Sequence, residues 1–377
     1  MPPVPDPAAR AAILTEAVRL FAAGTVDCGG LGKQSAAEFR TALWRSAGLP
    51  AALTDRWCAM LADRLASLLR VTPGNDRDVP RRTLVWLPGN TFTCLESLLA
   101  ALWAGELTWV RPSSREPLSA LRIISALLQA GWPAELLGFY PTRPNLLGAF
   151  TAITDRQIVY GGAEVARTIG ASPGAEFHGP MRVCAVVADA TARGIRVSSP
   201  GPTPRIDEQA AALLPLIASD AGRFCTALRA IFCPAEPAAL ADQLAEHLAA
   251  LLDALPFDPP GCLPLAASPD PDLAAETAAA VTSRLAAGDQ VITSRPLLDD
   301  AGGVTYLAPT LIHLANPAPT EEPDWGRPPL LGFEAPFPLV TIMRVTGEQQ
   351  ARLTETADVI HRLGPRDGLA TRTGAGR

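Results

Sequence analysis

The stretch "DAGRFCTALRAIF", residues 220–232, places a cysteine where a helix-like segment gives way to a strand-like apolar run. Gly222 and Arg223 come just before Cys225. An ionised cysteine sulfur is a strong nucleophile, and local backbone dipoles or a cation such as Arg223 would favour the thiolate. A lone cysteine is, however, more often a small buried core residue. The choice between nucleophile and core residue therefore depends on the rest of the chain.

Four further motifs carry groups that could serve a reaction. In "LPGNTF", Asn90 could donate a hydrogen bond from its carboxamide, although asparagine is also common in plain turns. In "WVRPSSREP", Arg111 is either a contact for a ribose or phosphate group or a solvated surface arginine. In "VYGGAEVARTIG", Gly161 and Gly162 could present backbone N–H groups to a pyrophosphate or form an ordinary tight turn. In "FHGPMRV", His178 could carry chemistry or be a loop histidine.

The predicted elements place several of these motifs at one edge of a sheet. Residues 7–71 are predicted to form three helices, with Ser35 and Thr54 as N-caps of the second and third. After them, short apolar runs alternate with helical segments of about ten to fifteen residues, which predicts a parallel, doubly wound sheet. The predicted strands are "RTLVWLPGN", "ELTWVRPS", "ELLGFYP", "RQIVYGG" and "MRVCAVVAD". Such sheets bind ligands at the carboxyl ends of their strands, where the turns "LPGN", "VRPSS" and "VYGG" are expected. A Pro-, Gly- and Ser-rich segment, residues 198–207, then leads to a second α/β region.

The composition excludes several classes of partner and site. The chain has 377 residues, of which 48% are hydrophobic, so two or three domains with real cores are expected. The net charge of -6 without a basic tract gives no reason to expect a nucleic-acid partner. Seven cysteines without CxxC spacing argue against a disulfide framework or a metal site and favour a reducing cytoplasm. No signal peptide is evident, and Glu96, Gly105 and Glu106 interrupt the longest apolar stretch, so no membrane span is expected.

Taken in order, the motifs resemble those of the aldehyde dehydrogenase superfamily, and more closely those of its acyl-CoA reductase branch, the long-chain fatty-acyl reductases of the bacterial luminescence type. "LPGNTF" resembles the family's strand-end Pro-x-Asn motif, and "WVRPSS" resembles its Lys-Pro-Ser turn. "VYGGAEVARTI" is similar to the Phe-Thr-Gly-Ser turn, and "DAGRFC" to the Gly-Gln-x-Cys stretch. "GGVTYLAPTLI" and "GFEAPFPLVTI" resemble the later Pro-Thr and Glu-x-Phe-Gly-Pro-Val segments.

The resemblance implies Cys225 as the nucleophile and Asn90 as a donor to the oxyanion. It also implies a cofactor site made by Arg111, Pro112, Ser113, Gly161, Gly162, Ala163 and Glu334, with Glu334 holding the nicotinamide ribose. Arg111 stands where the family has a lysine. Its fixed charge and fork geometry would also accept a 2′-phosphate, so NADPH is the expected cofactor and NADH the alternative.

One departure from the family decides between reactions. "HGPMR" stands where aldehyde dehydrogenases carry a Glu-Leu-Gly-Gly stretch, so His178 replaces the glutamate that activates water. A site without that base favours NAD(P)H-dependent reduction of an acyl thioester, on CoA or an acyl carrier protein, because no hydrolytic water is wanted. Cys225 would take the acyl group, and His178 could supply the proton for aldehyde formation. Two alternatives stay open: an NAD(P)-dependent aldehyde dehydrogenase that oxidises free aldehydes, and a catalytically silent binding or scaffold subunit.

The fold implied is α/β and aldehyde-dehydrogenase-like, with a doubly wound parallel-sheet cofactor domain and a second α/β catalytic domain. The expected divisions are an N-terminal helical segment packing on the cofactor domain, 1–80, an NAD(P)-binding Rossmann-like domain, 81–197, and a catalytic cysteine domain, 205–377. Relative to the family, the catalytic domain is expected to be shortened at its C-terminus. The usual dimer pairing is then in question, and a homo-oligomer or a partner subunit that completes the site are both open.

Overall fold

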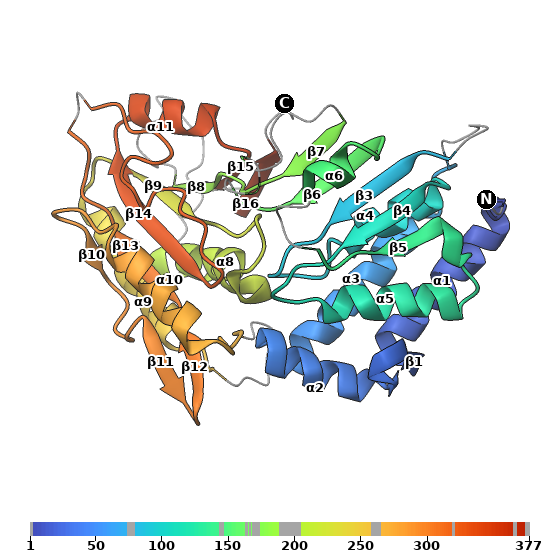
Figure 1. The fold of residues 1–377 in the computed structure, drawn as a ribbon. Helices are drawn as coiled ribbons and strands as arrows, with labels where there is room; N and C mark the ends of the chain where they lie inside the picture. Colours follow the sequence, from blue (N-terminus) through green and yellow to red (C-terminus); the bar gives the residue numbers. More distant parts are fainter. Residues whose placement is uncertain are drawn as a thin grey trace. The chain divides into compact units, whose positions relative to one another are not determined.

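The chain folds into two compact units, Met1–Pro180 and Met181–Arg377, in a computed structural model (Figure 1). Both units are α/β, and each is built around its own sheet. The structure describes all residues except 1–2, 74–79, 143–146, 163–164, 166, 168–173, 188–204, 258–264, 319–320, 365–367 and 374–377.

The first unit begins with the three predicted helices, α1 (Pro7–Ala23), α2 (Ala36–Ala47) and α3 (Ala51–Leu68). Ser35 caps α2 as predicted and forms a capping box with Glu38. The predicted cap at Thr54 is wrong, because α3 begins at Ala51 and Thr54 is buried inside the helix. Pro50 precedes the first turn, where its missing N–H costs no helical hydrogen bond. Helix α1 packs against α3 and against two helices of the sheet layer, α4 (Leu95–Trp103) and α5 (Leu118–Gln129).

The sheet of the first unit has five parallel strands in the order β5-β4-β3-β6-β7. Its strands are β3 (Arg82–Trp86), β4 (Leu107–Arg111), β5 (Leu137–Phe139), β6 (Arg156–Tyr160) and β7 (Ala175–His178), with the short helix α6 (Leu147–Thr151) between β5 and β6. A two-stranded pair, β1 (Val26–Asp27) and β2 (Lys33–Gln34), accompanies the N-terminal helices. The chain adds strands outward from β3 to β5 and then returns to the other side of β3. The topological switch point, where such sheets bind ligands, therefore lies between the carboxyl ends of β3 and β6.

Two strands near the unit boundary differ from the prediction. The segment 175–178 forms β7, although the sequence predicted no strand there. The predicted strand "MRVCAVVAD" forms β8 (Val183–Val187), but it pairs with β9 and β15 in the sheet of the second unit. The division between the compact units thus falls at 180/181, whereas the sequence prediction ran the cofactor domain to 197. Because all five β8 side chains are buried, the strand shows only an apolar run in the sequence, which does not specify its sheet.

The second unit is built around a seven-stranded sheet in the order β10-β13-β14-β9-β8-β15-β16. The five central strands run parallel, and the edge strands β10 and β16 are antiparallel to their neighbours. Besides β8, the strands are β9 (Ala230–Pro234), β10 (Gln290–Val291), β13 (Thr310–His313), β14 (Leu339–Val345), β15 (Val359–Gly364) and β16 (Gly368–Thr373). A separate hairpin is formed by β11 (Leu298–Ala301) and β12 (Val304–Leu307).

Helices cover both faces of this sheet, so it separates two apolar cores. Helices α8 (Ile206–Ala218) and α9 (Ala239–Asp253) lie on one face, and α10 (Pro271–Thr282) and α11 (Gly347–Glu355) also belong to this unit. Along β8, Val183 and Ala185 belong to the core with α8 and α9, whereas Cys184 and Val186 belong to the core with α10. This alternation follows from the two-residue period of a strand.

None of the helices formed by the described residues combines the length and apolar character needed to cross a bilayer. These residues also contain no group of three or more histidines, cysteines or carboxylates placed to hold a metal ion.

Candidate active site

The carboxyl edge of the five-stranded sheet places Arg111 beside Trp86. The two residues are register partners at the ends of β4 and β3, and the guanidinium lies 5.2 Å from the centroid of the indole ring. Its Nε donates to the carbonyl of Thr142 at 3.3 Å. Burial lowers the pKa of Arg111 from its usual value. Its terminal nitrogens make no hydrogen bond to a described residue, so they can meet a ligand at this edge.

The turns that follow β3 and β4 pack directly on one another. Pro112 and Ser113 are buried, and the Ser113 hydroxyl accepts a hydrogen bond from the backbone N–H of Arg115 at 3.2 Å. A Cβ at Gly89 would lie 2.6 Å from the Ser113 oxygen, so only glycine fits there. Asn90, the next residue, is half-buried. The "PGN" turn therefore packs against the "RPSS" turn. The sequence did not predict this contact.

The turn after β6 is open on one side. The N–H of Gly161 donates to the carbonyl of His178 at 3.2 Å, which ties the end of β6 to the end of β7. A Cβ at Gly162 would meet no atom of a described residue within 4 Å, so those residues leave space beside the backbone there. Such a bare backbone suits the close approach of a phosphate group. Ala163, the third member predicted for this turn, lies outside the described residues.

His178 is held on two sides. Its ring stacks on the phenol of Tyr160, with centroids 4.6 Å apart and planes inclined by 15°. Its Nε2 lies 3.0 Å from a carboxylate oxygen of Glu176. The hydroxyl of Tyr160 is 2.6 Å from that of Ser97, which fixes the phenol in turn. His178 is thus an ordered histidine at a strand end, not part of a loop.

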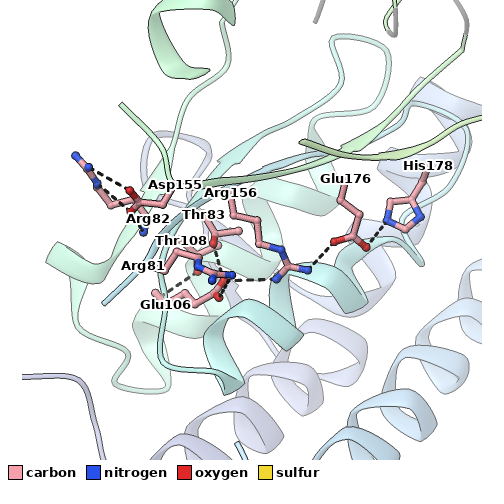
Figure 2. A network of polar contacts seen from close by, with 9 residues as sticks. All are labelled: Arg81, Arg82, Thr83, Glu106, Thr108, Asp155, Arg156, Glu176 and His178. Atoms are coloured by element: carbon pink, nitrogen blue, oxygen red, sulfur yellow. Dashed lines mark hydrogen bonds and ion pairs between the residues drawn. The ribbon is translucent and has the colours of Figure 1, made fainter. Parts of the chain in front are cut away.

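A chain of charged side chains continues from His178 across the sheet, as Figure 2 shows. Glu176 pairs with Arg156 at 2.7 Å, and Arg156 lies 3.8 Å from the buried carboxylate of Glu106. Burial would raise the pKa of Glu176, but the hydrogen bonds and charges of Arg156 and His178 outweigh it and lower that pKa. The Glu176 carboxyl is therefore ionised at neutral pH and lies against the imidazole of His178. Glu176 is not among the predicted site residues because no strand was predicted at 175–178; on β7, Glu176 and His178 are two residues apart and so share a face.

In the second unit, Cys225 follows a strained loop. Asp220, Ala221 and Gly222 have φ of 56°, 55° and 64°, all in the left-handed region that non-glycine residues rarely adopt. A Cβ at Gly222 would lie 2.5 Å from the backbone nitrogen of Pro338, so the loop packs backbone to backbone against the segment before β14. Strain of this kind persists only where the surroundings enforce it, and it clusters at functional sites. We call residues 219–225 the nucleophile loop.

The thiol of Cys225 differs from the other cysteines of this unit. Among the described cysteines of this unit, Cys184 and Cys233 are fully buried core residues, whereas Cys225 is half-buried. Burial, and then the negative charge of Glu334, raise the pKa of the Cys225 thiol. Hydrogen bonds from the backbone N–H groups of Cys225 and Thr226 and the charge of Arg229 act in the opposite direction. These donors and the Arg229 cation thus offset part of the effect that burial and Glu334 have on the pKa of the thiol.

Glu334 lies within electrostatic reach of this thiol. It is half-buried, and burial raises the pKa of its carboxyl while the charge of Arg229 lowers it. It forms no hydrogen bond or ion pair with any residue in the described part of the chain. The sequence analysis placed Glu334 at the cofactor ribose and did not name Arg229 at all.

The predicted site residues thus fall into two groups. Arg111, Pro112, Ser113, Gly161, Gly162, Asn90 and His178 belong to the first unit, and most of them line the carboxyl edge of its sheet. Cys225 and Glu334 belong to the second unit, where the structure brings them together.

The comparisons with known proteins concern the fold. Models of known protein families give no match to this chain, and the curated proteins give none either. Among solved structures, the chain is similar to an NAD-dependent benzaldehyde dehydrogenase from Corynebacterium glutamicum, with a TM-score of 0.68, 15% identity and coverage of 93% of this chain and 74% of that one. It is also similar to an NADP-dependent glyceraldehyde-3-phosphate dehydrogenase from Bacillus halodurans complexed with NADP, with a TM-score of 0.67, 16% identity and coverage of 96% and 75%.

A third similar structure is proline utilization A from Bradyrhizobium japonicum, with a TM-score of 0.66, 21% identity and coverage of 92% of this chain. The chain spans only 34% of that protein. The chain therefore has the fold of these dehydrogenases, and the expected α/β, aldehyde-dehydrogenase-like fold is confirmed.

Proposed function

We propose that the protein is an NAD(P)-dependent oxidoreductase that interconverts an aldehyde and an acyl group carried on Cys225, and that it acts as an aldehyde dehydrogenase. The observation that carries this proposal is the setting of Cys225, a half-buried thiol on a loop whose three left-handed residues pack backbone to backbone against Pro338. The similarity in fold to dehydrogenases named for benzaldehyde and glyceraldehyde-3-phosphate supports it, as an analogy at the level of the fold.

The proposed chemistry begins with the thiolate of Cys225 attacking the aldehyde carbonyl. The backbone N–H of Cys225, and Asn90 by the family resemblance, donate to the oxyanion that forms; each such donor is typically worth about 3 kcal/mol. An oxidised nicotinamide nucleotide, if bound by the residues of the first unit, would supply the hydride acceptor for oxidation of this adduct. The thioester left on Cys225 is then hydrolysed, and the thiolate departs as a good leaving group.

The residues of the first unit fit a nicotinamide nucleotide. The described residues leave space beside the backbone at Gly162, as a pyrophosphate requires, and Arg111 keeps its terminal nitrogens available at the end of β4. An arginine fork binds phosphate in a bidentate manner, so Arg111 supports NADP(H) over NAD(H). The turn that follows Arg111 packs against Gly89 through Ser113, and Pro112 in the same turn is buried. Glu334 keeps its assignment as a ribose contact within this proposal.

Proton transfer is assigned to His178. The Glu176 carboxylate and the Tyr160 ring hold its imidazole in one orientation, which a general acid or base needs. In aldehyde oxidation, His178 would take a proton from the water that attacks the thioester.

One observation favours a second candidate, the reduction of an acyl thioester to an aldehyde. His178 replaces the carboxylate base that the family resemblance leads one to expect, and an imidazole side chain can donate a proton where an ionised carboxylate cannot. In this direction Cys225 takes the acyl group from CoA or a carrier protein and releases the thiol. A reduced nicotinamide nucleotide, if bound, would supply the hydride that converts the acyl group to an aldehyde and frees the Cys225 thiolate. His178 then supplies the proton.

A paired assay distinguishes these candidates. One arm mixes the protein with a panel of acyl-CoA thioesters without cofactor and detects an acyl adduct on Cys225 by intact mass. The other arm supplies aldehydes with NAD⁺ or NADP⁺ and follows the reduced nicotinamide. Cys225→Ala is the control in both arms.

Aldehyde oxidation without CoA, abolished in Cys225→Ala, is the expected result. An adduct from acyl-CoA that NADPH or NADH discharges as aldehyde would instead establish the reductase. Neither signal from a folded protein would refute both candidates and point to the silent binding subunit.

A further inference from the structure

The side chain of Arg229 is buried directly behind the nucleophile loop. Only 3% of Arg229 is exposed. Its Nη2 donates to the carbonyl of Gly222 at 2.8 Å and to that of Phe224 at 3.4 Å. Its Nη1 donates to the carbonyl of Phe337 at 3.3 Å. One guanidinium thus binds the loop on both sides of Arg223 and the segment that follows Glu334.

The sheet fixes the backbone of the same residue. Both the N–H and the hydroxyl of Thr341 on β14 donate to the carbonyl of Arg229, at 3.0 Å and 3.1 Å. Because the backbone is held by β14, the reach of the side chain sets where the nucleophile loop lies. The tight contact of Gly222 with Phe337 and Pro338 lies between the carbonyls that Arg229 joins.

The guanidinium is also an uncompensated buried charge. It forms no ion pair within 4 Å with any carboxylate in the described ranges. Burial lowers the pKa of Arg229 to about 10, and the charges of Glu334 and of ionised Cys225 act against this shift. At neutral pH it is therefore a cation whose neighbours are carbonyl dipoles, Glu334 and the sulfur. A buried cation without an ion-pair partner favours the appearance of an anion beside it.

We infer that Arg229 is a positioning residue for the nucleophile: it clamps the strained loop against residues 334–338 and supplies the fixed positive charge that stabilises the Cys225 thiolate. The inference rests on the proposed role of Cys225, but it concerns the reactivity of the sulfur and not turnover. The groups whose charge or hydrogen bonding acts on the pKa of the Cys225 thiol are the Glu334 carboxyl, the Arg229 guanidinium and the backbone N–H groups of Cys225 and Thr226.

Substitutions at the two charged groups should act in opposite directions. Arg229→Met keeps most of the length and apolar volume but removes the cation, so the thiolate loses stabilisation. Glu334→Gln removes the anion that opposes the thiolate. The first variant should raise the pH midpoint of Cys225 ionisation, and the second should lower it.

The test is the rate of alkylation of Cys225 by iodoacetamide over a pH series, read from the Cys225 peptide by mass spectrometry. Near neutral pH, Arg229→Met should be about threefold to tenfold slower than the wild type, since a higher thiol pKa removes thiolate but makes it more nucleophilic. Glu334→Gln should be faster. Arg229→Lys, whose ammonium cannot span the same carbonyls, should have a midpoint between those of the wild type and Arg229→Met.

Arg122→Met is the matched control. Arg122 is also fully buried and donates to the carbonyls of Phe21, Gln34, Leu20 and Gly24, but it lies in the first unit. Its loss should lower the melting temperature and leave the Cys225 midpoint unchanged.

Two outcomes would overturn the inference. The first is an Arg229→Met protein with a lower melting temperature but a wild-type midpoint. The second, which decides the matter if Arg229→Met does not fold, is wild-type midpoints for both Arg229→Lys and Glu334→Gln. A folded wild type whose Cys225 resists alkylation at every pH would instead refute the proposed function, because the nucleophile would be inaccessible.

Discussion

The imidazole of His178 lies flat on the phenol ring of Tyr160, 4.6 Å away and nearly parallel to it. The two residues are register partners at the ends of β6 and β7, so the stacked rings lie at the carboxyl edge of the sheet. Since the Glu176 carboxylate holds the same imidazole at Nε2, the ring has one well-defined orientation. The Tyr160 ring is therefore a support that can be tested separately from the proton carrier itself.

Tyr160→Phe keeps the stacked ring and loses only the hydroxyl contact with Ser97, whereas Tyr160→Leu loses both. We expect kcat of the wild-type reaction to fall about tenfold in Tyr160→Leu and less than about threefold in Tyr160→Phe, because a misoriented acid or base transfers protons poorly. Steady-state kinetics measure both, with melting temperatures as the check on folding. Equal losses in the two variants would mean that the hydroxyl, and not the stack, matters.

Glu176→Gln should change stability only above a defined pH. The pKa of Glu176 is lowered in the folded protein, so its contribution is present above the unfolded value of about 4.3 and is lost as the pH falls through the lowered pKa. Because about half of the side chain is exposed, the effect at neutral pH should be small, about 0.5 kcal/mol. Melting curves of the variant and the wild type should therefore differ at pH 7 and converge near pH 3. A difference that is constant over this range would contradict the ion pairing with Arg156.

Glu116→Gln should change stability in the opposite direction from Glu176→Gln at neutral pH. Glu116 is buried, and burial raises its pKa despite hydrogen bonds from Ser119 and Leu118. Its contribution is present below about pH 4.3 and is lost as the pH rises through the raised pKa. Glutamine resembles the neutral acid and can still accept a hydrogen bond from the Ser119 N–H, so the variant should melt above the wild type at pH 7 and close to it at pH 4.

As a contrast, Glu38→Gln should lower the melting temperature at pH 7, because the hydrogen bonds to Ser35 lower the pKa of Glu38.

Gly222→Ala should destabilise the second unit by about 2–4 kcal/mol, because the new Cβ needs both a left-handed backbone and space that Pro338 occupies. Gly302→Ala is the matched control, with a φ of 61° but no atom within 4 Å of the added Cβ. It should cost only about 1 kcal/mol. Denaturant unfolding measures both. Equal costs would show that the contact between the nucleophile loop and Pro338 is loose.

Much of the sheet edge of the first unit could be predicted from the sequence, because apolar runs followed by "PGN", "RPSS" and "YGG" define strand ends through local chemistry. Two features of the fold could not be predicted from the sequence: the strand β7 and the sheet to which β8 belongs. Strand β7 has mostly exposed side chains and so lacks the apolar pattern of a buried strand. The sheet to which β8 belongs depends on its pairing with β15, some 170 residues later in the chain, and no local pattern encodes such a partner.

The site divides in the same way. Cys225 could be proposed because a cysteine after a helix-like segment matches a known motif. Arg229 could not, since in "TALRAIF" it is one basic residue within an apolar run, and its role comes from the Gly222, Phe224 and Phe337 carbonyls. Glu176 is an intermediate case, because a correct prediction of β7 would have placed it beside His178.

The left-handed run at Asp220, Ala221 and Gly222 also limits how this chain can vary among its descendants. Glycine, asparagine and aspartate are the residues that adopt such a backbone at low cost. Ala221 is not among them, and its side chain is buried. Asparagine or aspartate at this position would adopt the left-handed backbone at a lower free-energy cost, but would replace a buried apolar side chain with a polar one. The left-handed backbone and the buried environment therefore favour different residue types at this position. Substitutions will be accepted there mainly in combination with changes in the segment around Phe337, which makes the two segments co-vary as a pair.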